Sequence, residues 1–248
     1  MIPALLVALA FGQDALTLPV GRSAVLSLDG PPTALSASND RFRVEQMPPY
    51  LVLLGLRSGE GTFTLSEATG TRTVAVKVPA EGAVAGTGFN TEATAVSLPV
   101  DHGYLLPLPD DTAGHLVVRP SLAQVVPFGD DWLWVQGTKA GVTDVVVERS
   151  AHVPLVWTLT VGAEGTAPAD AHPVTGSFAV PVGGTLAVNL GTTPTGQIVG
   201  HPSRVTVQGA EAMDQSLELV GKKAGSTWLV TGHANGAIGV YRIEVTGG

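Results

Sequence analysis

The sequence predicts an all-β protein made of three tandem small β-sandwich domains. An alternating apolar run that ends in Gly-x-(Lys/Arg)-(Ser/Ala)-Gly occurs three times, at residues 51–59, 133–141 and 217–225. Such regular recurrence indicates repetition of a whole folding unit. No window shows a sustained helical period with caps, and short β-branched runs separated by Gly, Pro, Asn and Asp continue throughout, as is typical of strands and turns.

Each copy of the motif is predicted to be a β-hairpin. The alternating run reads as one strand, and the glycines supply positive φ in a tight turn before the returning strand. The hairpin glycines are Gly55, Gly59, Gly137, Gly141, Gly221 and Gly225.

Each repeat opens with an alternating strand that ends at a proline, namely Pro19, Pro99 or Pro181. Because proline cannot donate a ladder hydrogen bond, we expect the opening strand to lie at a sheet edge. The following strand and the closing strand keep the same alternation, which places one face of each strand in a core.

A unit of about 65 residues with six or seven short strands buries one sheet face either in a two-sheet sandwich or in a small barrel. We favour an Ig-like sandwich. The expected domains are residues 14–80, 95–162 and 176–248, called repeats one, two and three. Small and polar residues dominate 81–92 and 163–173, so these are expected to be linkers.

The composition argues against several classes of function. The net charge is -8, with 13 basic and 21 acidic side chains, so nucleic acid is not an expected partner. The absence of cysteine removes disulfides, thiolate metal sites and cysteine nucleophiles. We expect no cofactor.

The N-terminal segment resembles an export signal. Residues 2–11 are the most apolar run of the chain and contain Ala8-Leu9-Ala10, a small-x-small cleavage pattern, so residues 1–13 are expected to be a signal peptide. A first β-strand or an imperfect start site is the alternative, because no Lys or Arg precedes the run. No segment is long enough to cross a membrane as a helix.

Several side chains are of types that could carry chemistry. The six histidines have no shared-metal spacing, and His172, His201 and His233 fall in linker or turn-like stretches, which favours solvated surface positions. Asp110-Asp111 and Asp130-Asp131 lack the alternating pattern of a calcium loop and are expected to mark hydrated turns. No serine has the context of a hydrolase nucleophile. We therefore expect no metal site and no catalytic residue.

Aromatic and apolar side chains form the one unusual predicted surface. With Leu133 and Val135 directed inward, Trp132 and Trp134 share the opposite face of their strand. Tyr50 and Val52 stand at the equivalent positions of repeat one. These four residues are candidates for contact with a partner. The alternative is that a neighbouring repeat, a linker or the second sheet covers them.

The order Leu-x-Leu-Pro-Val-Gly-Arg-Ser, an alternating strand, Leu-x-Leu-x-Gly-x-(Lys/Arg)-x-Gly and a closing Val-x-Val resembles the N-terminal pilus-formation domain of Tad-type (Flp) pilus secretins. Residues 16–78 match best and 178–245 nearly as well, whereas in repeat two Asp101-His102 replaces the Gly-x pair. The resemblance implies a periplasmic β-domain of a pilus or export machine. No ring-building or pore-forming region follows, so the chain is not expected to be the pore itself.

The resemblance, together with the repeats, predicts a non-enzymatic accessory protein of a Tad-like pilus or secretin-based export assembly. It would be periplasmic or exported, associated with the outer membrane through protein partners, and self-association is possible. The alternative is a cell-surface Ig-like adhesin or a carbohydrate-binding protein.

Overall fold

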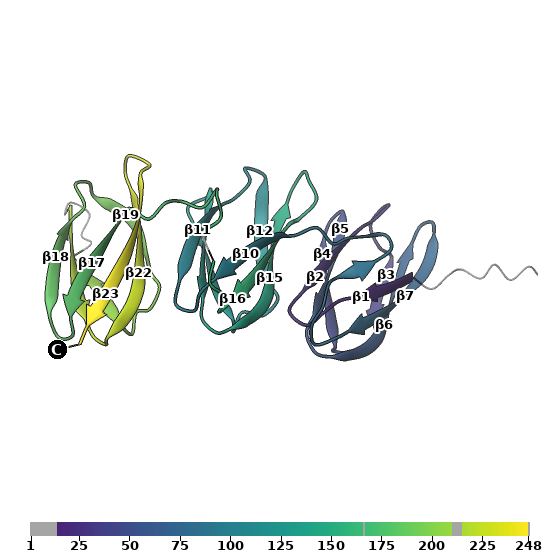
Figure 1. The fold of residues 1–248 in the computed structure, drawn as a ribbon. Coiled ribbons are helices and arrows are strands. Elements are labelled where there is room, and N and C mark those ends of the chain that lie inside the picture. Colours follow the sequence, from purple (N-terminus) through teal and green to yellow (C-terminus); the bar gives the residue numbers. More distant parts are fainter. Residues whose placement is uncertain (1–13, 166, 210–214, 248) are drawn as a thin grey trace, which may run out of the picture. The chain divides into compact units, whose positions relative to one another are not determined.

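The computed structural model describes residues 14–165, 167–209 and 215–247, and these residues are all-β (Figure 1). The predicted export signal lies outside them. Within the described residues no helix is long and apolar enough to cross a membrane. The chain divides into two compact units, one running through Ala93 with Val153–Val156, the other made of Thr94–His152 and Trp157–Gly248. Repeat one lies in unit 1, and repeats two and three lie in unit 2 apart from Val153–Val156.

Unit 1 is a sandwich of two sheets, with strand orders β3-β6-β7-β1-β8 and β4-β5-β2-β9. Its core consists of inward residues of both sheets, including Leu16, Leu26, Leu53, Phe63 and Val76, each at most 2% exposed. The strands are β1 (Asp14–Thr17), β2 (Ser23–Ser27), β3 (Ala34–Ala37), β4 (Phe42–Met47), β5 (Tyr50–Gly55), β6 (Gly59–Glu67), β7 (Gly70–Val78), β8 (Ala85–Gly86) and β9 (Phe89–Asn90).

Repeat two has a four-stranded sheet, β10-β16-β15-β12, and a three-stranded sheet, β11-β14-β13. The strands are β10 (Thr94–Leu98), β11 (Gly103–Pro107), β12 (Thr112–Val117), β13 (Ala123–Phe128), β14 (Trp132–Gly137), β15 (Gly141–Arg149) and β16 (Leu155–Val161).

Repeat three has the same layout, with sheets β17-β23-β22-β19 and β18-β21-β20. The strands are β17 (Gly176–Pro181), β18 (Thr185–Asn189), β19 (Pro194–Val199), β20 (Val205–Gln208), β21 (Ser216–Gly221), β22 (Gly225–His233) and β23 (Ile238–Thr246). None of the sheets in the described residues contains strands of two repeats. The predicted fold class, tandem small β-sandwich domains, is therefore confirmed.

The opening strand pairs in parallel with the closing strand in all three repeats: β1 with β7, β10 with β16, and β17 with β23. The edge prediction is confirmed for β10 and β17, which end their sheets. It is wrong for β1, because β8 pairs with it on its outer side.

The expected first linker is part of the first sandwich. Within residues 81–92, β8 pairs with β1 and β9 pairs with β2. The physical reason is apolar burial, since Val84 and Phe89 pack against the core of repeat one.

The Gly-x-x-x-Gly motifs are not hairpins, which corrects the prediction for Gly55–Gly59, Gly137–Gly141 and Gly221–Gly225. The strand before each motif and the strand after it belong to different sheets, so the motif is a corner that carries the chain across the sandwich. β5, for example, pairs with β2 and β4, whereas β6 pairs with β3 and β7.

The two glycines of each corner serve different purposes. The second takes positive φ, as at Gly59 (145°), Gly141 (147°) and Gly225 (128°). The first leaves space for the chain after the opening strand: a Cβ on Gly55 would lie 2.4 Å from the carbonyl oxygen of Pro19. The corner therefore allows the end of the opening strand to lie close against the second sheet.

Candidate functional site

A four-residue turn follows the opening strand in every repeat. In repeat one the Arg22 N–H donates to the Pro19 oxygen over 3.0 Å, and the Gly21 N–H donates to the Gly55 oxygen over 2.8 Å. In repeat two the donors are the N–H groups of His102 and Asp101, and in repeat three those of Gly184 and Gly183. Each donor–acceptor distance lies within 0.1 Å of its counterpart in repeat one. One backbone arrangement is thus built three times.

The third turn position requires positive φ, as in type II turns. Gly21 has φ 84° and Gly183 has φ 75°, but repeat two places Asp101 there, with φ 65°. Asp101 is the one residue other than glycine with positive φ among the described residues. A side chain in this left-handed region costs conformational energy, and such strain persists where the surroundings compensate for it.

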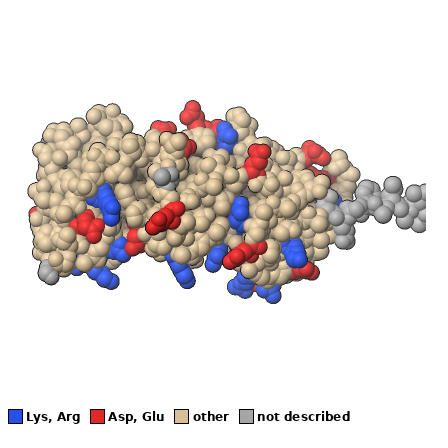
Figure 2. Space-filling model, viewed as in Figure 1, with Lys and Arg blue, Asp and Glu red and all other residues tan. Residues whose placement is uncertain are grey.

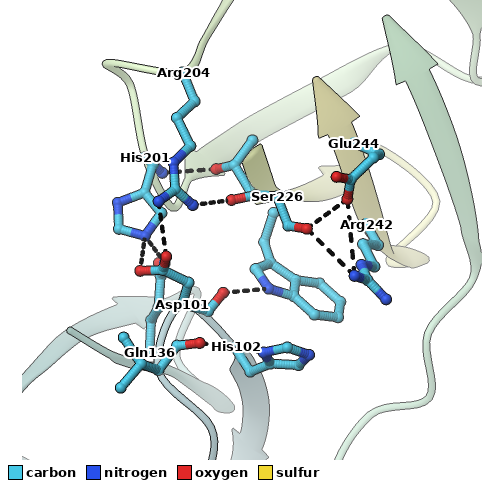
Figure 3. Close-up of polar contacts among 11 residues, drawn as sticks. Asp101, His102, Gln136, His201, Arg204, Ser226, Arg242 and Glu244 are labelled. Carbon is cyan, nitrogen blue, oxygen red and sulfur yellow. Dashed lines mark hydrogen bonds and ion pairs between the residues drawn. The ribbon is translucent and has the colours of Figure 1, made fainter. Parts of the chain in front are cut away.

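The compensation for Asp101 comes from repeat three (Figure 3). The Arg204 guanidinium donates from Nη2 to Asp101 Oδ2 over 2.7 Å, and His201 Nε2 lies 2.9 Å from Asp101 Oδ1. The Trp228 indole N–H donates to the Asp101 carbonyl oxygen over 3.0 Å. Asp101 therefore joins repeats two and three, and we call the contact between these repeats the joint.

Arg204 is held in position by its own repeat. Arg204 lies in a turn just before β20, where its backbone N–H donates to the His201 oxygen over 2.9 Å. Its side-chain Nη1 donates to the Ser226 carbonyl oxygen. The Arg204 and Asp101 side chains are 22% and 31% exposed. A partly buried, charge-assisted pair held this way is stronger than an exposed surface pair.

The electrostatics of the joint favour ionised Asp101. Partial burial by itself would raise the pKa of this carboxyl, but the hydrogen bond and charge of Arg204, with smaller contributions from His201, outweigh it and hold the pKa below 3.8. Asp101 therefore remains an anion above that pH.

The apolar part of the joint packs the outer face of one sheet of repeat two on the outer face of one sheet of repeat three. Trp134 is fully buried, and its ring centroid lies 6.1 Å from that of Trp228, which is 5% exposed. The buried cluster consists of Leu105, Phe128 and Trp134 from repeat two and Trp228, Val230 and Val240 from repeat three. Large buried aromatic groups of this kind dominate the energetics of contacts between domains.

Three glycines make the close approach possible. A Cβ on Gly103 would lie 2.2 Å from the Trp134 ring, and one on Gly200 would lie 2.4 Å from Gln136 Oε1. A Cβ on Gly232 would lie 3.2 Å from the Phe128 ring. Gly200 and Gly232 belong to repeat three and approach side chains of repeat two, so the two surfaces fit at close range.

The predicted aromatic face is divided between buried and accessible residues. Trp134 lies inside the joint, where the following repeat covers it, as the alternative interpretation of this face expects. Trp132 stays half-buried at the rim, with its ring 5.4 Å from that of His172. In unit 1, Val52 is fully buried and Tyr50 is half-buried.

Two histidines that are expected at solvated surface positions are buried or half-buried instead. His233 ends β22, is 8% exposed and has threonine hydroxyls on both ring nitrogens, at 2.8 and 3.1 Å. His201 is part of the joint. Both lie in turn-like sequence, but His233 is held by threonines of its own repeat and His201 contacts Asp101 and Gln136 of repeat two. In the part of the chain that the structure describes, no three His, Asp or Glu side chains form a group that would hold a metal ion.

Asp111 lies in a second polar cluster. A hydrogen bond from His152 over 2.6 Å and one from Arg149 over 2.8 Å lower its pKa to about 2. The cluster joins the start of β12 to the end of β15. It ties together two strands of one sheet, as expected of a structural ion pair.

A groove of about 560 Å³ runs along the rim of the joint. Trp132, Asp130 and Asp131 line it from repeat two, and Gln197 and His233 line it from repeat three. An aromatic ring beside carboxylates and an amide offers both a stacking surface and hydrogen-bond acceptors.

Sequence reasoning missed Arg204 and Trp228, which carry the joint from repeat three. One signal pointed to the contact: Asp101 stands where the other two repeats have glycine. A residue that is unfavourable for its own turn indicates a contact elsewhere.

Figure 2 shows acidic and basic side chains interspersed on the face in view, without a large patch of one sign. The sheets define a protein of tandem β-sandwich domains. Residues 92–162, which span repeat two, match the family model described as "Pilus formation protein N terminal region". The match covers repeat two alone, and a pilus-formation domain there supports a role in secretion or pilus formation.

No curated protein sequence matches the chain significantly. Among solved structures, the chain is similar to an endo-fucoidan hydrolase of glycoside hydrolase family 107, at 16% identity and TM-score 0.24, covering 94% of this chain and 43% of that one. It is also similar to the I-band fragment I67-I69 of titin, at 9% identity and TM-score 0.19, covering 95% and 96%. The chain thus spans less than half of the hydrolase. Scores this low do not bear on function.

Proposed function

We propose that this protein is a non-enzymatic, exported binding component of a pilus or secretin-based export assembly, with protein partners at the periplasmic side of the outer membrane. The match of residues 92–162 to the pilus-formation domain is the observation that carries the proposal. Repeats one and three, which precede and follow repeat two in the chain, share its strand order, to which β8 and β9 are added in repeat one. Repeated modules present several weak contacts, which sum to durable attachment when their spacing fits the partner.

The joint supports a binding role for unit 2 in particular. Repeats two and three share a buried apolar cluster and a charged anchor, so we expect them to act as one pair. A pre-organised pair loses less conformational entropy on binding than two independently moving domains.

Affinity purification of the tagged protein from its native envelope tests this proposal. We expect secretin or pilus subunits to be recovered with the parent, and fewer of them with Trp228→Ala, which opens the joint. Arg242→Ala is the matched control, because the contacts of Arg242 with Ser226 Oγ at 3.2 Å and with Glu244 at 3.7 Å are exposed and lie within repeat three. Recovery of polysaccharide alone would contradict the proposal.

A carbohydrate-binding role is the second candidate, and the groove beside Trp132 favours it. Sugar rings stack on aromatic faces, and the nearby carboxylates and amide would accept and donate hydrogen bonds to hydroxyl groups. A glycan array with the parent and with Trp132→Ala discriminates between the two roles. Retained glycan binding by the variant, or no binding by either protein, removes this candidate.

A further inference from the structure

The groove along the rim of the joint is lined by two strands that lie at sheet edges. β13 ends the three-stranded sheet of repeat two, and β19 ends the four-stranded sheet of repeat three. Residues 126–128 of β13 and 195–198 of β19 line the groove. The edge position of β19 is a property of the repeat, because the equivalent strands β3 and β12 also end their sheets in repeats one and two, where the following chain is described.

The backbone of β19 is oriented to pair with an extended segment in the groove. The Gly200 N–H donates to the Trp228 oxygen of β22 over 2.9 Å, so these two residues form a hydrogen-bonded pair. Because hydrogen-bonded and non-hydrogen-bonded pairs alternate along an antiparallel ladder, Ile198 also bonds to β22, whereas the N–H and C=O of Gln197 point away from it. Gln197 is exposed and lines the groove. A ligand with an extended backbone therefore has hydrogen-bond partners on β19.

Trp132 gives the groove an aromatic surface. It begins β14 directly after the turn 129–131 that joins β13 to β14, and its side chain is half-buried. The ring of His172 meets the ring of Trp132 at 78°, with the two centroids 5.4 Å apart. From repeat three, Gly196 lines the groove, and nothing lies within 4 Å of a Cβ added there. An aromatic ring in such a groove can hold a cation against its face.

The charge of the groove is negative. Asp130 and Asp131 line it and are exposed, and no Lys or Arg side chain is among the described residues that line it. Within the described part of the chain neither carboxylate forms a hydrogen bond or an ion pair, whereas Asp101 and Asp111 are each held by an arginine. Two carboxylates without cationic partners, next to an aromatic ring, are complementary to a positively charged group.

We propose that this groove binds an extended segment of a partner protein that carries a Lys or Arg side chain. The backbone of the segment pairs with β19 at Gln197, and its cationic group lies against the ring of Trp132. The carboxylates of Asp130 and Asp131 neutralise that group. The inference rests on the proposed function in one respect, namely that the partner is a protein. Because the groove is continuous with the joint and is lined by both repeats, the bound segment also stabilises their contact.

A basic peptide fits the groove better than a neutral sugar or a second copy of the chain. A neutral ligand would remove Asp130 and Asp131 from water without supplying a compensating charge, which costs free energy. A sugar also lacks the regular N–H and C=O groups that match a strand edge. A second copy carries a net charge of -8 and is repelled as a whole.

A synthetic peptide Ser-Val-Thr-Arg-Thr-Val-Ser, blocked at both ends, is the probe, and the same peptide with Gln in place of Arg is its matched control. Titrated into the isotope-labelled full chain at millimolar concentration, the Arg peptide is expected to shift the indole N–H resonance of Trp132 and the amide resonances of Asp131 and Gln197. The Gln peptide is expected to bind at least about fivefold more weakly, because it lacks the cation.

Variants of the protein give a second readout. Trp132→Ala, and separately the double variant Asp130→Asn with Asp131→Asn, are each expected to weaken binding of the Arg peptide at least about fivefold. Asp110→Asn is the matched control with unchanged binding, because Asp110 is also an exposed carboxylate of repeat two but does not line the groove. If a variant fails to fold, the two peptides on the parent still decide the question.

Absence of these shifts at millimolar Arg peptide, equal binding of the two peptides, or an equal loss with Asp110→Asn would overturn the proposal. Shifts of the same resonances by the neutral oligosaccharide cellohexaose but not by the Arg peptide would assign the groove to carbohydrate and also overturn it. Concentration-dependent shifts without any ligand would assign the groove to a second copy, with the same consequence. The envelope purification with the parent decides the pilus role separately from each of these results.

Discussion

In repeats one and three, a glycine with positive φ follows the opening strand, whereas in repeat two the same position holds Asp101. The hydrogen bonds of the turn are the same within 0.2 Å. Asp101 adds two contacts from its carboxylate and one from its carbonyl oxygen to repeat three. In repeat two, the local strain at Asp101 is therefore offset by the contacts that Asp101 makes with repeat three.

The largest expected effect comes from opening the apolar part of the joint. Trp228→Ala removes a nearly fully buried ring, which costs about 3–5 kcal/mol in protein cores. We expect repeats two and three to unfold in separate calorimetric transitions rather than together. Trp132→Ala, at the half-buried rim, is the control and is expected to keep the shared transition. Equal losses for the two variants would refute this description of the joint.

Removing the cationic partner is expected to have the next largest effect. Arg204→Ala leaves Asp101 strained and without its closest charged partner, which should lower the free energy of unfolding by about 1.5–3 kcal/mol. Arg204→Lys keeps the charge but loses the planar fork, so an intermediate loss is expected. Urea unfolding measures both. A parent-like midpoint for Arg204→Ala would show that the ion pair contributes no net stability.

The comparison predicts a change of sign for Asp101→Gly. In the parent, this substitution removes the carboxylate contacts and should destabilise by about 1 kcal/mol. In the Arg204→Ala, His201→Ala background those contacts are already gone. There the glycine should stabilise by about 0.5–1 kcal/mol because it relieves positive φ. A double-mutant cycle from urea unfolding tests this, and effects of the same sign in both backgrounds would contradict it.

The converse substitution places aspartate in a turn that has no partner for it. Gly183→Asp has space for its side chain, since nothing lies within 4 Å of an added Cβ. Its cost is therefore conformational, about 1 kcal/mol or less. Thermal unfolding should show a small decrease for Gly183→Asp and none for Gly247→Asp, which lies beyond β23 without positive φ. A stabilised Gly183→Asp would mean that the turn itself favours aspartate.

The smallest expected effect is on acid stability. Because the folded pKa of Asp101 lies below 3.8, its contribution is fully present above that pH and is lost as the pH falls through the folded pKa. Asp111 titrates in the same direction, with a pKa of about 2, so the parent alone does not isolate Asp101. The stability difference between the parent and Asp101→Asn should therefore shrink below about pH 4. A constant difference down to pH 2 would contradict the role given to the Asp101 charge.

The joint had only a partial signal in the sequence. The alternation around Leu133 correctly placed Trp132 and Trp134 on one face, but it did not indicate that Trp228 covers Trp134. The motif glycines mark turns correctly, but the hairpin prediction is wrong, because local spacing does not specify which sheet the next strand joins. Likewise, small residues in 81–92 indicated a linker, although Phe89 there is part of the first core.

The sequence by itself determined the all-β class, the threefold repetition and the inward residues of each strand, because strand alternation and turn chemistry are local properties. Only the tertiary structure decided which outer faces meet, that residues 81–92 complete the first sandwich and why Asp101 occupies a glycine position. Those features depend on residues far apart in the chain, such as Asp101 and Arg204, whose proximity no local pattern encodes.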